Sequence, residues 1–201
     1  PLLKLRFGLK DNFHLHEGDA LRFDFQTLAP VEHGLRVVGN LPYNISTPLI
    51  FHLLESASLI DDMHFMLQKE VVERMCAKPG SGHWGRLSIM VQYHCQTEHL
   101  FNVGPGAFNP APKVDSAIVR LTPHRTLPCP ARDDRLLDRL VREAFNQRRK
   151  TLRNTLKPLL GSDDIVAAGV DPTLRPEQLE LADFVRLADQ LAELHKGTPS
   201  S

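Results

Sequence analysis

Residues 37–44 read VVGNLPYN, and this stretch decides how the rest of the chain is interpreted. The apolar residues before Gly39 predict a strand that stops there and leads Asn40 into a loop. A helix is expected directly afterwards, because Thr47 suits an N-cap and Pro48 suits the first helical position. Ligands of open α/β sheets bind at the carboxyl ends of the strands, so this loop is a predicted functional site.

The residue types in the loop suit the recognition of an exocyclic amine. The carboxamide oxygen of Asn40 and the backbone carbonyl of Leu41 can each accept a hydrogen bond. Pro42 has no N–H and fixes φ, so it would hold that carbonyl stiffly. Tyr43 offers a flat face on which a flipped-out base could stack. The pattern favours methyl transfer to an adenine nitrogen, and the alternative is an ordinary strand–turn–helix with an Asn/Pro loop.

Three stretches resemble one enzyme family. Residues 39–49 (GNLPYNISTPL) are similar to the N-L-P-Y region of S-adenosylmethionine-dependent adenine dimethyltransferases acting on ribosomal RNA, in particular the small-subunit enzymes (the KsgA/RsmA family). Residues 108–117 (FNPAPKVDSA) resemble the F-x-P-x-P-K-V-D-S-A signature of that family, and residues 145–154 (FNQRRKTLRN) resemble its F-x-x-R-R-K-T-L-R-N run. Because the three runs occur in the order of the family, the chain is interpreted as an rRNA adenine dimethyltransferase.

The resemblance implies catalytic roles for residues of two loops. Asn40 and the Leu41 carbonyl would orient the target amine, and Pro42 would stiffen their backbone. Tyr43 and Phe108 would clamp the flipped adenine between their rings, with stacking worth roughly 1–3 kcal/mol per base. Without the resemblance, Phe108 is interpreted as an aromatic that anchors its proline-rich loop.

The resemblance also implies where the methyl donor, S-adenosylmethionine, is bound. Residues 13–17 alternate apolar and polar side chains and predict a strand, and Asp19 follows it. Asp19 would accept a hydrogen bond from the adenine amino group of the donor, and Asn40 would also contact the donor. Without the resemblance, Asp19 is a turn or cap residue. His14 and His16 would share one face of the strand, but no third ligand is marked, and no metal site is predicted.

A basic run forms the far end of a helix that is expected to open at Asp133 and Asp134. Basic residues at the end of a helix can merely satisfy its macrodipole, but five in fourteen positions exceed that need and indicate phosphate contacts. The predicted RNA-binding residues are Arg148, Arg149, Lys150, Arg153 and Lys157.

The overall composition is that of an ordinary globular protein. The 201 residues carry 24 basic and 24 acidic side chains, so net charge gives no sign of a nucleic-acid partner. The three cysteines lack the spacing of a zinc site or a disulfide framework. With no membrane-spanning run or signal peptide, a cytoplasmic protein is expected.

The expected fold class is α/β. Residues 1–124 are interpreted as an incomplete Rossmann-like methyltransferase domain, consisting of its later strands and a terminal hairpin at residues 101–121. Residues 125–201 are interpreted as a small all-α domain that binds rRNA or the ribosome. The start of the chain offers neither an initiating Met nor a glycine-rich donor loop, so an N-terminal part of the domain is expected to be missing, and this piece alone is expected to be inactive or nearly so.

The function implied by the resemblance is N6,N6-dimethylation of adjacent adenosines near the 3′ end of small-subunit (16S) rRNA during ribosome biogenesis. The expected partner of a monomeric protein is the immature small ribosomal subunit. Two alternatives remain open. One is a large-subunit rRNA adenine methyltransferase of the macrolide-resistance type, and the other is a non-catalytic assembly or transcription factor descended from the same fold.

Overall fold

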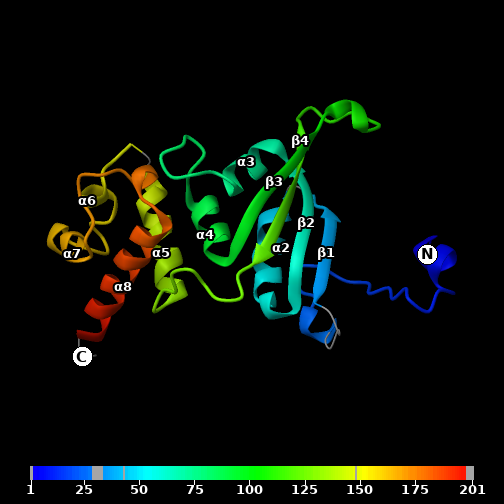
Figure 1. Ribbon diagram of the computed structural model, residues 1–201, viewed down its shortest axis with the longest axis horizontal. Coiled ribbons are helices and arrows are strands. Elements are labelled where there is room, and N and C mark those ends of the chain that lie inside the picture. The colour runs from blue at the N-terminus through cyan, green and yellow to red at the C-terminus, as the bar shows by residue number, and fades with distance from the viewer. Residues whose placement is uncertain (1, 29–33, 43, 148, 198–201) are drawn as a thin grey trace.

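The computed structural model describes residues 2–28, 34–42, 44–147 and 149–197, and it combines a sheet with helices (Figure 1). The four strands are β1 (Leu35–Asn40), β2 (Ile60–Gln68), β3 (Cys95–Val103) and β4 (Ser116–Pro123). The helices are α1 (Leu2–Phe7), α2 (Ser46–Leu54), α3 (Lys69–Met75), α4 (Arg86–His94), α5 (Asp134–Ala144), α6 (Leu152–Thr155), α7 (Ser162–Ala167) and α8 (Leu181–Gly197). Short 3-10 turns lie at Phe25–Leu28, Ala57–Leu59, Pro105–Ala107, Phe145–Gln147 and Pro176–Gln178.

The sheet has the strand order β1-β2-β4-β3. Strands β1 and β2 are parallel, whereas β4 runs antiparallel to both β2 and β3. Because β4 runs in the opposite direction, its first residues lie beside the last residues of β2, at the end of the sheet where β1 also finishes. The predicted terminal hairpin is confirmed as β3 and β4. The buried apolar run at residues 63–68 predicts a strand, and residues 69–75 and 86–93 are predicted to be helices; the structure confirms them as β2, α3 and α4.

Helices α2, α3 and α4 pack on one face of the sheet. The buried side chains of β2 alternate along the strand, as expected where one face meets a hydrophobic core. They join apolar residues of the three helices in a single cluster, which includes Phe65, Ile50, Val72 and Val91.

Helix α4 also takes part in a second core. Its other face contributes Ile89 and Tyr93 to a cluster with α5 and α8, where Leu140 and Phe184 are fully buried. Helix α5 begins where the Asp133 carboxylate accepts hydrogen bonds from two backbone N–H groups of its first turn. The α/β fold followed by a helical region is therefore confirmed, and α4 joins the two parts.

Strand β1 and helix α2 differ slightly from the prediction. β1 continues through Gly39 and Asn40, because Asn40 stays in register with Met66 of β2. Helix α2 has Ile45 rather than Thr47 at its N-cap.

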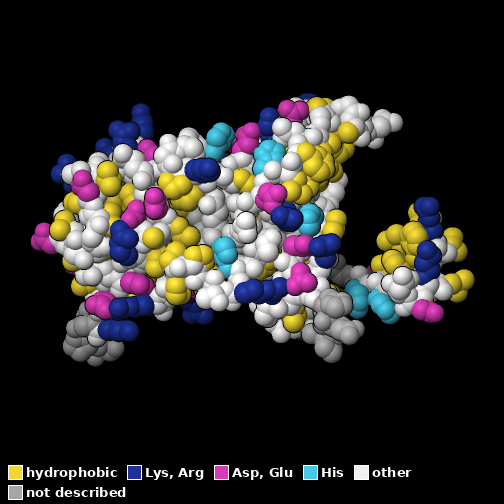
Figure 2. All heavy atoms as spheres, in the orientation of Figure 1, with side chains coloured by type: hydrophobic (Ala, Val, Ile, Leu, Met, Phe, Trp, Pro, Cys, Tyr) yellow, Lys and Arg dark blue, Asp and Glu magenta, His cyan; other side chains and the backbone are white. Residues whose placement is uncertain are grey.

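The predicted strand at residues 13–17 is wrong. This segment pairs with no strand in the described part of the chain, so its backbone has none of the ladder hydrogen bonds that hold a strand. It belongs to an N-terminal arm that lies apart from the rest of the molecule, with hydrophobic side chains beside basic ones (Figures 1 and 2). Leu5 is 84% exposed and Leu9 is 100% exposed in this arm.

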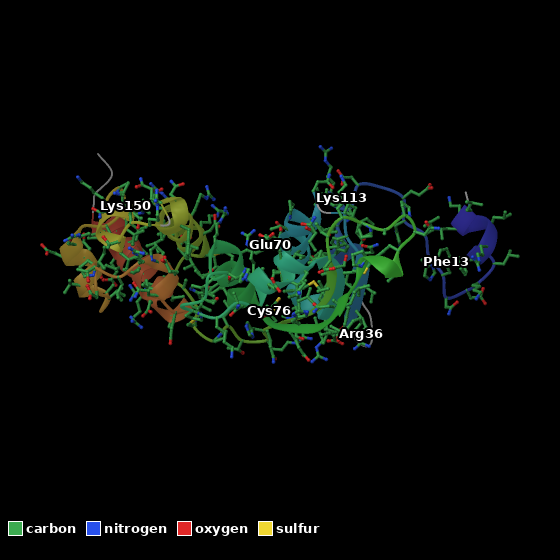
Figure 3. All side chains as sticks on the ribbon, turned by 90° about the horizontal axis from the view of Figure 1, so that it is seen from above. Phe13, Arg36, Glu70, Cys76, Lys113 and Lys150 are labelled. Carbon is green, nitrogen blue, oxygen red and sulfur yellow. The ribbon has the colours of Figure 1, made fainter. Side chains whose placement is uncertain are left out.

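The basic run does not extend helix α5, contrary to the prediction. α5 ends at Ala144, and the Phe145 ring stacks on Phe184 at 5.9 Å as the chain turns. The N–H groups of Leu152 and Arg153 then donate to carbonyls of residues 174 and 172, not to α5. Lys150 and Phe13 lie toward opposite ends of the molecule, with Glu70 of α3 between them (Figure 3).

No helix in the described ranges is long and apolar enough to cross a membrane. The same ranges contain no group of three or more His, Cys, Asp or Glu side chains that could hold a metal ion.

Candidate active site

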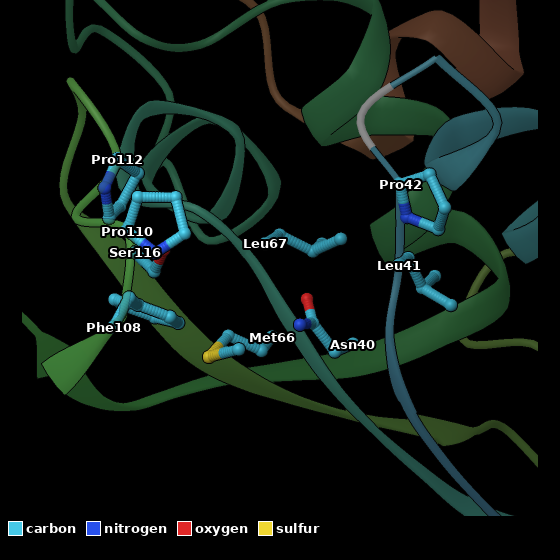
Figure 4. Close-up of a pocket in the computed structure, with 9 residues that line it drawn as sticks. All are labelled: Asn40, Leu41, Pro42, Met66, Leu67, Phe108, Pro110, Pro112 and Ser116. Carbon is cyan, nitrogen blue, oxygen red and sulfur yellow. The ribbon is translucent and has the colours of Figure 1, made fainter. Parts of the chain in front are cut away.

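A cavity of about 420 Å³ opens where β1 and β2 end and β4 begins (Figure 4). This volume lies within the roughly 300–1,000 Å³ that is usual for small-molecule sites. Its walls come from three strand ends and from the proline-rich loop that precedes β4. The described residues that line it are Asn40, Leu41, Pro42, Met66, Leu67, Phe108, Pro110, Pro112 and Ser116.

Backbone hydrogen bonds fix the wall that follows β1. The Leu41 N–H donates to the Met66 carbonyl at 3.3 Å, which carries the ladder one residue beyond the strand. The N–H groups of Ile45 and Ser46 both donate to the Pro42 carbonyl, at 3.2 and 3.1 Å. The loop is therefore closed by a tight turn that leads directly into α2, and the buried Leu41 side chain anchors it.

Asn40 points its carboxamide into the cavity (Figure 4). Within the described part of the chain, this group makes no hydrogen bond, so both its oxygen and its nitrogen remain available to a ligand. Asn40 is solvent-exposed, so water can satisfy this group until a ligand binds, and its place at the carboxyl end of a strand is where ligands bind in open α/β sheets.

Phe108 stands on the opposite wall (Figure 4). Its N–H donates to the Pro105 carbonyl at 3.1 Å, and the Ala107 N–H donates to the Gly104 carbonyl at the same distance. These turns hold the half-buried ring in place before any ligand arrives. The arrangement brings Phe108 to the cavity of Asn40, Leu41 and Pro42 although the two loops are far apart in the sequence.

The cavity is electrically neutral along its described walls. None of the nine lining residues has a titratable side chain. Such a site can orient a ligand by hydrogen bonding and stacking, but its described walls contain no acid or base for proton transfer. The lining residues that sequence reasoning missed are Met66, Leu67, Pro110, Pro112 and Ser116. Met66, Leu67 and Ser116 are ordinary strand residues that line the cavity through the sheet register, and the two prolines follow Phe108 in its loop.

Asp19 is not among the residues that line the cavity. It lies in an exposed turn, where its Oδ1 accepts a hydrogen bond from the Leu21 N–H at 3.0 Å and its Oδ2 lies 3.8 Å from Arg22. The turn is tied to α2 by His52, whose Nε2 contacts the Phe23 carbonyl at 2.8 Å. That carbonyl, followed by Glu55, raises the pKa of His52 above its usual value.

The other predicted residues are not at the cavity or are not described. Tyr43 and Arg148 lie outside the described residues. Arg149, Lys150, Arg153 and Lys157 are exposed on the helical region and do not line the cavity.

A family model described as "Ribosomal RNA adenine dimethylase" matches residues 1–193. The chain belongs to this family. It is 77% identical over 194 residues to a Pseudomonas aeruginosa protein named "Ribosomal RNA small subunit methyltransferase A". This alignment covers 96% of this chain and 72% of that protein. A Marinomonas protein of the same name is 58% identical over 189 residues, covering 94% of this chain and 71% of that protein. The resemblance found in the sequence is thereby confirmed.

Solved structures of related enzymes have the same fold. A dimethyladenosine transferase from Plasmodium falciparum matches with a TM-score of 0.76 and 29% identity, over 96% of this chain and 76% of that chain. The 23S rRNA methyltransferase ErmE matches with a TM-score of 0.68 over 95% of this chain and 77% of that chain. Its identity is 22%, so this second likeness concerns the fold alone.

The Asn40 carboxamide is a group that fits a polar part of S-adenosylmethionine, the methyl donor of this family. Asn40 supplies an amide that can form hydrogen bonds with polar groups of the donor. Gly39, directly before it, has no side chain that would contact Leu41. A Cβ at Gly39 would lie 3.0 Å from the Leu41 Cδ2 and 3.6 Å from the Phe65 Cδ1, so a larger residue would press on the wall of the cavity. Asp19 could accept a hydrogen bond through Oδ2, but the structure does not bring it to the cavity.

Proposed function

We propose that the protein catalyses S-adenosylmethionine-dependent N6,N6-dimethylation of adjacent adenosines near the 3′ end of small-subunit (16S) rRNA during ribosome biogenesis. The observation that carries the proposal is the free carboxamide of Asn40, aimed into a neutral cavity opposite the Phe108 ring. Membership of the rRNA adenine dimethylase family supports the reaction class. The names of two relatives, at 77% and 76% identity, support the small subunit as the target.

In the proposed reaction, the exocyclic amine of adenine is the nucleophile, and the donor supplies an electrophilic methyl group. The Asn40 Oδ1 and the Leu41 carbonyl accept hydrogen bonds from the amine and hold it in line for attack. Pro42 keeps that carbonyl in place, and Phe108 stacks against the adenine ring, with Tyr43 proposed on its other face. As the new N–C bond forms, the S–CH3 bond of the sulfonium would break and S-adenosylhomocysteine would leave as a neutral thioether. The methylated amine then gives its proton to solvent water, so the neutral described walls of the cavity are sufficient.

The second methylation uses the same contacts. A monomethylated amine keeps one N–H and its lone pair, so it can be held by one acceptor and attack again. The cavity of about 420 Å³ offers room for the first methyl group beside the ring.

The remaining assignments are part of the same proposal. We assign residues 1–124 to the methyltransferase domain and residues 125–201 to the helical domain that binds rRNA. Asp19 and Asn40 are the proposed donor contacts, and Arg148, Arg149, Lys150, Arg153 and Lys157 the proposed phosphate contacts. The protein is proposed to act as a monomer in the cytoplasm on the immature small subunit.

The test is methyl incorporation from labelled donor into immature small subunits. A chimaera is best suited to it, in which residues 1–201 replace the matching region of the Pseudomonas aeruginosa relative, because 77% identity should preserve the fold. We expect dimethyladenosine in the small-subunit rRNA. A chimaera that binds the particles but incorporates no methyl groups, beside an active parent, would indicate the non-catalytic alternative. Incorporation into large-subunit rRNA instead would indicate the macrolide-resistance type.

Residues 1–201 by themselves are expected to bind the donor weakly and to show no turnover. The reason is that only Asn40, of the two proposed donor contacts, lines the cavity. Isothermal titration calorimetry with S-adenosylmethionine checks this, and a micromolar affinity would contradict it.

A further inference from the structure

The Asn40 cavity contains a second polar side chain that the proposed reaction does not use. Among the nine described residues that line the cavity, only Asn40 and Ser116 have a polar atom in the side chain, since the others are Leu, Met, Phe and Pro. The proposed reaction gives a role to the Asn40 carboxamide. It leaves the Ser116 hydroxyl without one.

The sheet holds the backbone of Ser116 on both sides. Ser116 is the first residue of β4, where it is in register with Gln68 of β2 and with Val103 of β3. A serine side chain has one χ angle, so the hydroxyl of this residue loses little conformational entropy when a ligand pairs with it. The position of the group is therefore set before a ligand arrives.

The sheet register places Ser116 on the same face of the sheet as Asn40. Asn40 is in register with Met66, and Met66 is in register with Ile118. Ser116 precedes Ile118 by two residues, and side chains two residues apart on a strand point to the same face. Ala117, between them, belongs to the core that the helices cover, so Ser116 and Asn40 share the opposite face.

The Ser116 hydroxyl is unpaired although the residue is almost completely buried. Only 4% of the surface of Ser116 is exposed, and its hydroxyl makes no hydrogen bond within the described ranges. A buried hydroxyl without a partner costs free energy, which a ligand that pairs with it would recover. Because Ser116 lines the cavity, a ligand bound there is within the reach of this group.

Ser116 and Asn40 stand on opposite walls of the cavity. Ser116 lies beside Phe108 and Pro110, with Met66 between this wall and Asn40 (Figure 4). Strand β2 separates β1 from β4, which places these two strands roughly 10 Å apart at the usual strand spacing. An adenine that is held by its amine at Asn40 and stacks on Phe108 therefore turns another edge of its ring toward Ser116.

A serine hydroxyl suits a ring nitrogen of adenine. The hydroxyl has one O–H donor, and the ring nitrogens of adenine that carry no substituent are acceptors. Cytosine also has an exocyclic amine, so acceptors at Asn40 and Leu41 do not by themselves distinguish the two bases. A donor that meets a ring nitrogen of the larger purine adds this distinction.

We propose that Ser116 is a specificity-determining residue, whose hydroxyl donates a hydrogen bond to a ring nitrogen of the flipped target adenine. The proposal rests on the proposed function for the identity of the base. It adds a contact at the edge of the ring to the contacts of the amine with Asn40 and of the ring face with Phe108.

The experiment compares the chimaera with its Ser116→Ala variant on reconstituted small subunits. The rRNA of these particles has adenosine, 1-deazaadenosine, 3-deazaadenosine or 7-deazaadenosine at the target positions, and each analogue replaces one ring nitrogen by C–H. With adenosine, Ser116→Ala should lower kcat/KM about fivefold, which is the usual effect of losing one hydrogen bond. With one of the analogues it should have no further effect, because that contact is already absent.

Filter binding of the same particles gives a second readout that does not depend on methyl transfer. The matched control is Ser56→Ala, since Ser56 is 5% exposed but does not line the cavity. It should stay within about twofold of the unsubstituted chimaera with all four particles. Ser116→Cys, which keeps a weak donor of similar size, should retain more activity than Ser116→Ala. Circular dichroism melting shows whether each variant is folded, and Ser116→Cys takes the place of an unfolded Ser116→Ala.

The proposal is overturned if Ser116→Ala lowers kcat/KM by the same factor with adenosine and with all three analogues, because a purely structural role does not depend on the base. Unchanged kinetics with adenosine would also overturn it. A higher KM for the methyl donor, with an unchanged KM for the particles, would show that the hydroxyl contacts the donor instead. If the unsubstituted chimaera incorporates no methyl groups, the proposed function fails, and the binding of the four particles still tests Ser116.

Discussion

The cavity at the strand ends and a groove between the sheet and the helical region are built from opposite chemistry. We call the second surface the interdomain groove, and its charged walls are Arg74, Arg86, Asp134, Arg135, Asp138, Arg139 and Arg142. The cavity has neutral walls, with a free carboxamide at Asn40 and a ring at Phe108. The groove has arginines on both sides, and Arg74, Arg135 and Arg139 lack a carboxylate partner in the part of the chain that the structure describes. In nucleic-acid recognition, contacts to bases specify and contacts to phosphates position. The two regions therefore offer a ligand different contacts: the cavity offers a hydrogen-bonding group and a ring face, whereas the groove offers guanidinium groups.

The largest expected effect comes from removing the polar group of the cavity. Asn40→Ala should lower methyl incorporation by the chimaera by roughly 10²–10³-fold, since a positioned hydrogen-bonding group at a reacting centre has about that effect. Binding of oligouridylate, an RNA without adenine, should not change, because the proposed phosphate contacts lie outside the cavity. Asn102→Ala, on the exposed part of β3, is the control. Equal losses of RNA binding and methylation in Asn40→Ala would contradict the contrast between a cavity that holds a base and the charged surfaces outside it.

Phe108→Ala should have the next largest effect. Loss of stacking on the adenine is expected to cost roughly 1–3 kcal/mol, seen as weaker binding of adenosine-containing substrate RNA by the chimaera. Phe101→Ala, which removes a ring that is 58% exposed on β3, should leave the affinity unchanged. If Phe108→Leu binds as tightly as the wild type, the ring face is not used and Phe108 only anchors its loop.

Tyr93 connects the two sides of the interdomain groove, and its removal tests how firmly they are joined. The buried hydroxyl donates to Asp134 and accepts from the Ala131 N–H at 3.0 Å. Tyr93→Phe should lower the free energy of unfolding by about 0.5–1.5 kcal/mol, because the part-buried hydrogen bonds to Asp134 and Ala131 are lost. Urea denaturation measures this. Unchanged stability would mean that water replaces the hydroxyl.

The same residue predicts a dependence of stability on alkaline pH. Burial, followed by the hydrogen bond to Asp134, raises the pKa of Tyr93 to about 12 from 10.0. The folded state therefore favours the protonated hydroxyl. Its stabilisation is fully present below pH 10 and is lost as the pH rises towards about 12. The free energies of unfolding of the wild type and of Tyr93→Phe should converge as the pH rises from 10 towards about 12. A constant difference between them would argue against the raised pKa of Tyr93.

The smallest effect concerns the turn that holds Asp19, which belongs to neither region. The pKa of His52 is raised above 6.5 by the Phe23 carbonyl and by Glu55, so the tie to α2 is strongest below that pH and weakens as the pH rises through the raised pKa. Limited proteolysis should cleave residues 8–24 faster at pH 8 than at pH 6. His52→Gln should remove most of this difference, and a difference that persists would point to another group.

The sequence predicted the elements around the Asn40 cavity better than the segment at residues 13–17 or the end of α5. Local patterns were enough for β2, α3, α4 and the hairpin, because alternation and helical spacing report directly on burial. The resemblance added Phe108, whose role depends on an antiparallel strand that returns to the same sheet edge. The strand at residues 13–17 was wrong because alternation predicts a strand only when a partner strand is available. The end of α5 was missed because Phe145 turns the chain through a contact with Phe184, which lies far along the sequence.

By itself the sequence determined the family and the reaction class, since these depend on short runs whose chemistry is local. Only the tertiary structure decided which side chains share a surface. Met66 and Ser116 reach the cavity through the sheet register, and Asp19 does not reach it. The arginines of the interdomain groove come from three separate helices, and net charge is zero, so neither composition nor spacing could reveal them. Helix α4 packs against both cores, one on each face, and so it brings the arginines of the three helices around one groove.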